Sequence, residues 1–184
     1  MIYTTVTKHA WSHKMKASDV DAHAVASFRK FYKLIPRNKD TTLLILKLHL
    51  LVEEQVRAFV NERMQTREAL SRTRLDCHQV ICLAEALSAE PIIPNIWEAA
   101  RKLNTLRNDI AHKLEPKGVL DRMSNITALI GVNLETIDVS NRTQEVAVVD
   151  NFIYAASMLH NAISAFVPQS HTKCLTPAPE SSEA

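Results

Sequence analysis

Apolar residues along most of the chain recur every three or four positions, the spacing that places them on one face of an α-helix. This pattern predicts six helices, over residues 18–35, 41–64, 75–87, 95–114, 119–130 and 144–166. Residues 131–141 show no clear period, and 136–139 are compatible with a short extended segment. The sequence therefore predicts an all-α fold, an up-and-down helical bundle of about five to six helices.

Prolines and capping residues mark the expected helix ends. Asp40 or Thr41 is the expected N-cap of helix 41–64, and Asn95 is that of helix 95–114, with Glu98 at the capping-box position. In the first helix the face expected to be buried consists of Val20, Ala24, Phe28, Phe31 and Leu34. In the last helix it consists of Val148, Phe152, Ala155, Leu159 and Ile163.

The helix over residues 41–64 is apolar on all sides in its first half, where leucine and isoleucine fill nearly every position of 43–51. A helix without a polar face must be covered all round. The sequence therefore predicts a central helix, a helix that faces a second subunit, or both.

Composition and charge divide the chain into one domain with two tails. We expect a basic N-terminal arm at 1–17, a helical domain at 18–167, and a disordered tail at 168–184 that is rich in proline and serine. The basic arm is either solvated or in contact with phosphates. The net charge of +2 is too small to indicate a nucleic-acid partner by itself. No secretory signal or membrane span is recognisable, so we expect a soluble, cytoplasmic protein without membrane contact.

The sequence contains none of the common catalytic or cofactor-binding motifs, such as a glycine-rich phosphate loop, a GxSxG elbow or HExxH. No two histidines share a helix at metal-ligand spacing with an acid, so we expect no metal and no cofactor. Cys77, Cys82 and Cys174 have no disulfide-like spacing. We interpret them as small core residues of a protein in a reducing compartment.

Arg107 and His112 are the candidate catalytic pair. Without a nucleophilic serine or cysteine, such a pair suits RNA cleavage, because the substrate's own 2′-hydroxyl can attack the phosphate. An imidazole with an ordinary pKa can transfer the proton, and a guanidinium can stabilise the phosphate's charge. The spacing alone is a weak signal, because Arg72 and His78 are similarly spaced.

The helix that carries the pair makes Arg107 unusual. Its apolar stripe consists of Ile96, Ala100, Leu103, Ile110 and Leu114, and Arg107 falls in the middle of that stripe. A charge there needs either a partner or a wet cleft. His112 falls on a polar side of the helix, together with Trp97, Arg101, Asn104 and Asn108.

Structural interpretations of both residues stay open. Arg107 could pair with Glu53 or Glu54, and His112 in the last turn could simply complement the helix dipole. Trp97 could pack in the core or an interface, or it could stack on a base.

The segment from Leu103 to Leu114, with Arg107-Asn108 followed by His112, resembles the signature of the HEPN superfamily, an arginine, four to six residues and a histidine. The long apolar helix with Glu53 and Glu54 midway resembles the helix that precedes this motif in the family. The resemblance covers roughly residues 20–165 in architecture and about ten residues in motif.

The resemblance implies a homodimeric helical bundle whose two motifs share one cleft. Many members are metal-independent endoribonucleases that act as toxins or in phage defence, some with an antitoxin such as a nucleotidyltransferase. By motif, Arg107 would bind the scissile phosphate, His112 would act as base or acid, and Asn108 would orient one of them. Glu53 is the expected acid that holds Arg107. The further RNA-binding residues that we expect are Arg101, Asn104 and Lys113.

Two alternatives remain from the sequence. One is a non-catalytic HEPN-like module that binds RNA, a nucleotide or a partner protein. The other is a helical adaptor in which Arg107 and His112 are structural.

A dimer would allow Arg107 and His112 to act on one phosphate. Within one chain they cannot easily do so, because residues five apart on a helix point about 140° apart. Two copies across a two-fold axis could form a composite site.

Overall fold

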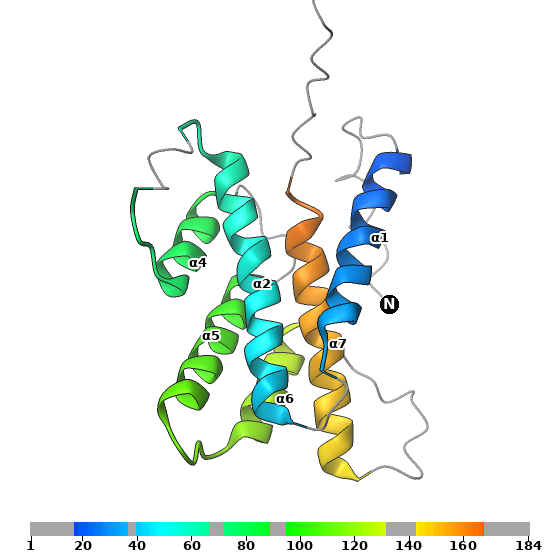
Figure 1. Ribbon diagram of the computed structural model, residues 1–184, viewed down its shortest axis with the longest axis vertical. Coiled ribbons are helices and arrows are strands. Elements are labelled where there is room, and N and C mark those ends of the chain that lie inside the picture. Colours follow the sequence, from blue (N-terminus) through cyan, green and yellow to red (C-terminus); the bar gives the residue numbers. More distant parts are fainter. Residues whose placement is uncertain (1–16, 37–39, 67–71, 89–94, 132–142, 168–184) are drawn as a thin grey trace, which may run out of the picture.

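The fold is an all-helical bundle (Figure 1). The computed structural model describes residues 17–36, 40–66, 72–88, 95–131 and 143–167. Within these ranges there are six helices and no strand, which confirms the all-α prediction. The helices are α1 (Ala17–Leu34), α2 (Thr41–Arg63), α4 (Cys77–Ala86), α5 (Ile96–His112), α6 (Val119–Leu129) and α7 (Gln144–Ser164). The expected basic arm, the short extended segment and the C-terminal tail lie outside the described residues, except Ala17.

Helix α2 occupies the centre of the bundle, with α4 and α5 on one side and α7 on the other (Figure 1). Its apolar first half is covered mainly within the chain, since Leu44, Ile45, Leu48 and Leu51 are buried. The prediction of a central helix is thus confirmed. Leu50 is the exception, because 57% of it stays exposed.

Helix α7 packs against α2 and α6, and four of its five predicted inward residues are fully buried. Helix α1 packs against α7, where Phe31 lies 5.1 Å from the His160 ring. The prediction for α1 was partly wrong, because Phe28 and Leu34 are exposed. One packing partner cannot cover an apolar face as wide as the one that the sequence gives α1.

Side-chain capping explains where two helices begin. Asp40 caps α2 by accepting a hydrogen bond from the backbone N–H of Leu43. Asp76 caps α4 in a reciprocal capping box with Gln79. The predicted cap of α5 was wrong in detail: Asn95 stands at the N-cap but is left-handed, and its side chain caps nothing. Glu98 instead pairs with Lys102 one turn further on.

None of the helices in the described ranges combines the length and the apolar character needed to cross a membrane.

Candidate functional site

A pocket of about 300 Å³ opens where α2, α4 and α5 meet. Helix α2 contributes its middle, α4 its N-terminal end, and α5 its C-terminal half. The lining residues are His49, Glu53, Asp76, Cys77, His78, Asn104, Arg107 and Asn108. All eight carry polar side chains, whereas most of the buried residues of the described chain are apolar. A polar hollow of this kind suits a polar ligand or a reacting group.

Arg107 is half-buried and faces this pocket. Its Nη1 donates a hydrogen bond of 2.9 Å to Oδ1 of Asn108. Its Nε is buried and has no hydrogen-bond partner in the described part of the chain. The sequence allowed two environments for this charge, an ion-pair partner or a wet cleft, and Arg107 lies in a polar cleft. The guanidinium keeps donors available for a ligand.

Neither predicted acid holds Arg107. Glu53 pairs with Arg57, whose Nη2 and Nε donate to Oε1 at 2.6 and 2.9 Å. Glu54 pairs with Lys30 of α1. Glu53 does line the pocket, so it remains a neighbour of Arg107 without forming an ion pair with it. Arg107 therefore does not form the structural ion pair with Glu53 or Glu54 that the sequence left open.

His112 lies apart from this pocket. It is the last residue of α5, it is exposed, and it is not among the pocket's lining residues. Its side chain makes no hydrogen bond or ion pair within the described ranges. One chain therefore does not bring Arg107 and His112 to the same place, as the angle between positions five apart on a helix implies.

The end of α5 that carries His112 is held by a small ion-pair network. Asp109 accepts from Lys113 at 2.8 Å and also from Arg122 of α6. Hydrogen bonds from Lys113 and Arg122 hold the pKa of Asp109 below its usual value. These contacts tie the end of α5, which carries the exposed His112, to α6.

The three predicted RNA-binding residues already have partners within the chain. Arg101 pairs with Glu85 of α4, and Lys113 pairs with Asp109. Asn104 is not on a polar outer side at all, since it is buried against α2 and accepts a hydrogen bond from His49. Exposed ion pairs such as those of Arg101 and Lys113 are weak enough to exchange for a phosphate.

The predicted apolar stripe of α5 was too long at its C-terminal end. Leu114 lies beyond the helix and is fully exposed, so the buried part of the stripe ends before it. Trp97 is buried and meets Phe59 of α2 edge-to-face at 5.3 Å between ring centroids. It is a packing residue in this chain and is not available for stacking on a base.

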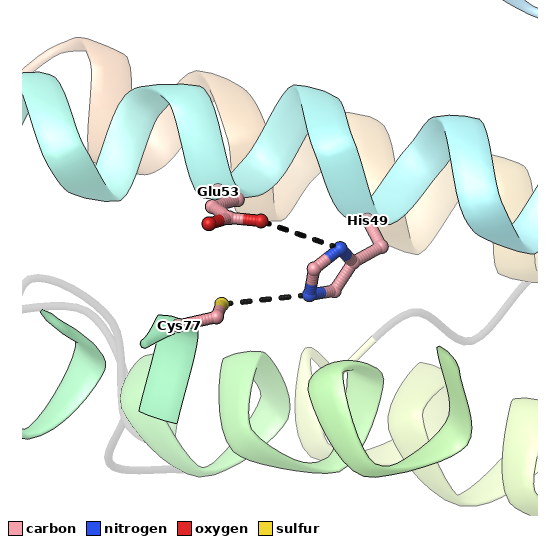
Figure 2. Close-up of side chains that lie close together, drawn as sticks. All are labelled: His49, Glu53 and Cys77. Atoms are coloured by element: carbon pink, nitrogen blue, oxygen red, sulfur yellow. Dashed lines mark hydrogen bonds and ion pairs between the residues drawn. The ribbon is translucent and has the colours of Figure 1, made fainter. Parts of the chain in front are cut away.

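His49 is the buried centre of the pocket, and its spacing from Glu53, one turn along the same helix, is the one feature of the sequence that could have indicated it. Its Nε2 donates a hydrogen bond of 3.0 Å to Oδ1 of Asn104. The Sγ of Cys77 lies 3.4 Å from the same nitrogen, and Oε2 of Glu53 lies 3.7 Å from Nδ1 (Figure 2). The imidazole thus stands between a thiol on α4 and a carboxylate on its own helix.

Burial controls the protonation of this group. It lowers the pKa of His49, although Glu53 and the hydrogen bond to Asn104 act in the opposite direction. Burial, reinforced by the charge of Glu53, raises the pKa of the Cys77 thiol to about 12. At neutral pH His49 is therefore an uncharged imidazole, and Cys77 is an uncharged thiol.

The lowered pKa of His49 predicts a specific loss of stability in mild acid. In the unfolded chain His49 has its ordinary pKa of 6.5 and takes up a proton below it, whereas the folded chain resists that proton. The free energy of unfolding should therefore fall as pH drops from about 7.5 to about 5.5. The decrease should be smaller in His49→Gln, as measured by urea denaturation at both pH values. Equal decreases in the two proteins would contradict this assignment.

The sequence prediction that the cysteines are core residues needs correction. Cys82 is exposed, with its Sγ 3.7 Å from Nε2 of His78, so it is no core residue, and Cys174 lies outside the described residues. The expectation of no metal site rested on the absence of paired histidines. In the described part of the chain, His49, Glu53 and Cys77 each place one possible donor atom within 4.8 Å of the other two, a grouping that the spacing of histidines does not reveal.

Comparison with protein-family models, with curated proteins and with solved structures gave no match.

Proposed function

We propose that this chain is one subunit of a metal-independent endoribonuclease of the HEPN type, cytoplasmic and active as a toxin or in phage defence. Its cleft would be shared between two subunits of a homodimer. The observation that carries the proposal is Arg107, a half-buried guanidinium in a polar pocket with an Nε that no described residue satisfies. Asn108, its neighbour in the motif, orients it through one hydrogen bond. The family assignment itself rests on the resemblance in sequence.

The proposed reaction needs only the RNA and these side chains. The ribose 2′-oxygen attacks the adjacent phosphorus, and the bond from phosphorus to the 5′-oxygen of the next nucleotide breaks. His112 removes the 2′-hydroxyl proton or returns a proton to the leaving 5′-oxygen. Arg107 stabilises the negative charge that develops on the phosphate oxygens. The products are a 2′,3′-cyclic phosphate and a free 5′-hydroxyl.

The separation of Arg107 from His112 supports a site built from two subunits. Because His112 is exposed at the end of α5, a second copy can approach it and place its own Arg107 nearby. Leu50, exposed on α2, offers apolar area for such a contact. Arg101 and Lys113 would add charge along the path of the RNA by exchanging their surface acids for phosphates.

The product ends test the proposal most directly. The purified full chain is incubated with single-stranded RNA in EDTA, and the fragments are analysed for their termini. We expect fragments ending in 2′,3′-cyclic phosphate, and we expect expression of the gene to slow growth of the host. Intact RNA across a broad set of substrates would contradict an enzymatic role.

The second candidate is a non-catalytic module that binds RNA, a nucleotide or a partner protein such as an antitoxin. What favours it is the same exposure of His112, which has no orienting partner in the described residues. Wild-type protein that retains RNA on a gel but never cuts it would support this alternative. A gene for a nucleotidyltransferase next to this one would support the toxin assignment.

A further inference from the structure

Three side chains in the pocket can donate to a metal ion. His49 and Glu53 stand one turn apart on α2, and Cys77 is the first residue of α4 (Figure 2). One donor atom from each lies within 4.8 Å of the other two. They form part of a pocket that opens to the surface, so an ion can reach them. Neither Arg107 nor His112, the pair proposed for RNA cleavage, belongs to this group.

The imidazole presents a free lone pair to the carboxylate. Since Nε2 of His49 donates its proton to Asn104, Nδ1 carries the lone pair. This Nδ1 is buried without a hydrogen-bond partner and faces Oε2 of Glu53 at 3.7 Å. Two electron-rich atoms opposite each other, with no proton between them, repel unless a cation lies between them. A metal ion bound to both at about 2.0–2.2 Å fits a separation of this size.

The residues that would orient these ligands are already in place. Histidine ligands of metals nearly always donate their other ring N–H to a fixed acceptor, and Asn104 provides that acceptor here. Ligating carboxylates are likewise held by hydrogen bonds, and Arg57 holds Oε1 of Glu53. This arrangement leaves Oε2 as the free oxygen of Glu53. Arg57 is itself fixed by the backbone carbonyl of Leu75, just before α4.

We propose that Nδ1 of His49, Oε2 of Glu53 and Sγ of Cys77 bind a zinc ion. A set of imidazole, carboxylate and thiolate suits zinc, whereas magnesium and calcium prefer oxygen ligands alone. The Sγ of Cys77 lies 3.4 Å from Nε2, the other ring nitrogen, so Cys77 must rotate toward Nδ1 before the donors reach the distances of about 2.0–2.3 Å that zinc requires. The fourth position faces the pocket, where water, Asp76 or His78 can complete the shell.

Binding changes the charges in a balanced way. Cys77 releases its proton to solvent, so a thiolate and a carboxylate together neutralise the two charges of the ion. Because burial disfavours the thiolate before metal binds, affinity should rise with pH. The cleavage proposal does not depend on this ion, since cleavage is tested in EDTA and the zinc site by direct binding. A negative result for zinc binding would leave the cleavage proposal standing, and a negative result for cleavage would leave the zinc proposal standing.

Cobalt(II) is the probe, because it replaces zinc and reports thiolate ligation by absorption. The reduced, EDTA-treated and dialysed full chain is titrated with cobalt(II). We expect one ion per chain, tetrahedral bands in the visible, and a thiolate-to-cobalt charge-transfer band that stoichiometric zinc removes. No bound cobalt at saturating concentration would overturn the proposal.

Substitutions assign the ligands, and Cys82 supplies the matched control. Cys77→Ser should lose the charge-transfer band, whereas Cys82→Ser should keep it with unchanged affinity. Asn104→Ala should weaken cobalt binding by about 10–100-fold, because His49 loses its orienting partner. A band that survives Cys77→Ser, or one that disappears in Cys82→Ser, would overturn the assignment.

A measurement on the wild-type protein covers the case in which Cys77→Ser does not fold. Zinc should protect Cys77, but not Cys82, from alkylation as mapped by peptide mass. Equal alkylation of Cys77 with and without zinc would contradict the site.

Discussion

Replacing Arg107 or His112 by alanine is expected to lower the rate of RNA cleavage by about 10²–10³-fold. Loss of Arg107 removes the paired donors that stabilise the phosphate in the transition state, and loss of His112 removes the proton transfer. Arg107→Lys should recover only part of the activity, because an ammonium group cannot form the two parallel hydrogen bonds of a guanidinium. Initial rates on one defined single-stranded RNA, measured in EDTA, give the comparison.

Both variants should remain folded, which separates a catalytic role from a structural one. Arg107 has no acidic partner within the described ranges, so its removal leaves no buried carboxylate unpaired. His112 is exposed and contributes nothing to the core. Arg72→Ala is the matched control, since Arg72 is exposed and belongs to the similarly spaced pair of Arg72 and His78. Loss of folding in Arg107→Ala would favour the structural interpretation.

Mixing the two inactive variants tests the shared cleft. If each site takes Arg107 from one subunit and His112 from the other, a mixed dimer has one intact site and one doubly damaged site. Random mixing should then restore about a quarter of the wild-type rate, because half of the dimers are mixed and each has one of two sites. If both residues act within one subunit, mixing restores nothing.

Much of the fold could be predicted from local patterns, but the extent to which the apolar face of α1 is buried could not. The spacing of Phe152, Leu159 and Ile163 fixes the buried face of α7 because neighbours cover that helix along its length. The same rule applied to Phe28 of α1 was wrong. Periodicity tells which face is apolar, and only the arrangement of neighbours tells how much of that face is covered.

The features of the candidate site that arise within one helix could be predicted from the sequence, whereas its contacts between helices could not. The unfavourable position of Arg107 in an apolar stripe was visible in the sequence, and the structure places that side chain in a polar pocket. The contact between Asn104 and His49 joins residues 55 positions apart, so no local pattern reveals it. Cys77 enters the pocket only because α4 packs against α2. The spacing of His49 and Glu53, one turn apart on one helix, was the single available signal.

Phe59→Ala should destabilise the fold by about 3–5 kcal/mol, the usual cost of removing a fully buried aromatic ring. Phe59 is completely buried on α2 and touches Trp97 of α5, and the guanidinium of Arg63 lies 3.5 Å from its ring centroid. The substitution thus removes core volume, an aromatic pair and a cation–π contact together. Urea denaturation monitored by circular dichroism measures the change in the free energy of unfolding.

The same experiment on Phe28→Ala provides the control, because it removes the same ring from a site that is 44% exposed on α1. There the loss should be about 1 kcal/mol, since little of the ring leaves an apolar environment. Equal losses at the two positions would mean that α1 is covered by a second surface in solution.

Because the contact between Phe59 and Trp97 joins α2 to α5, Phe59→Ala should also weaken cobalt binding at His49. The pocket exists only while α2 and α5 stay packed together. Phe59→Ala should therefore lose cobalt binding at a urea concentration at which Phe28→Ala still binds cobalt fully.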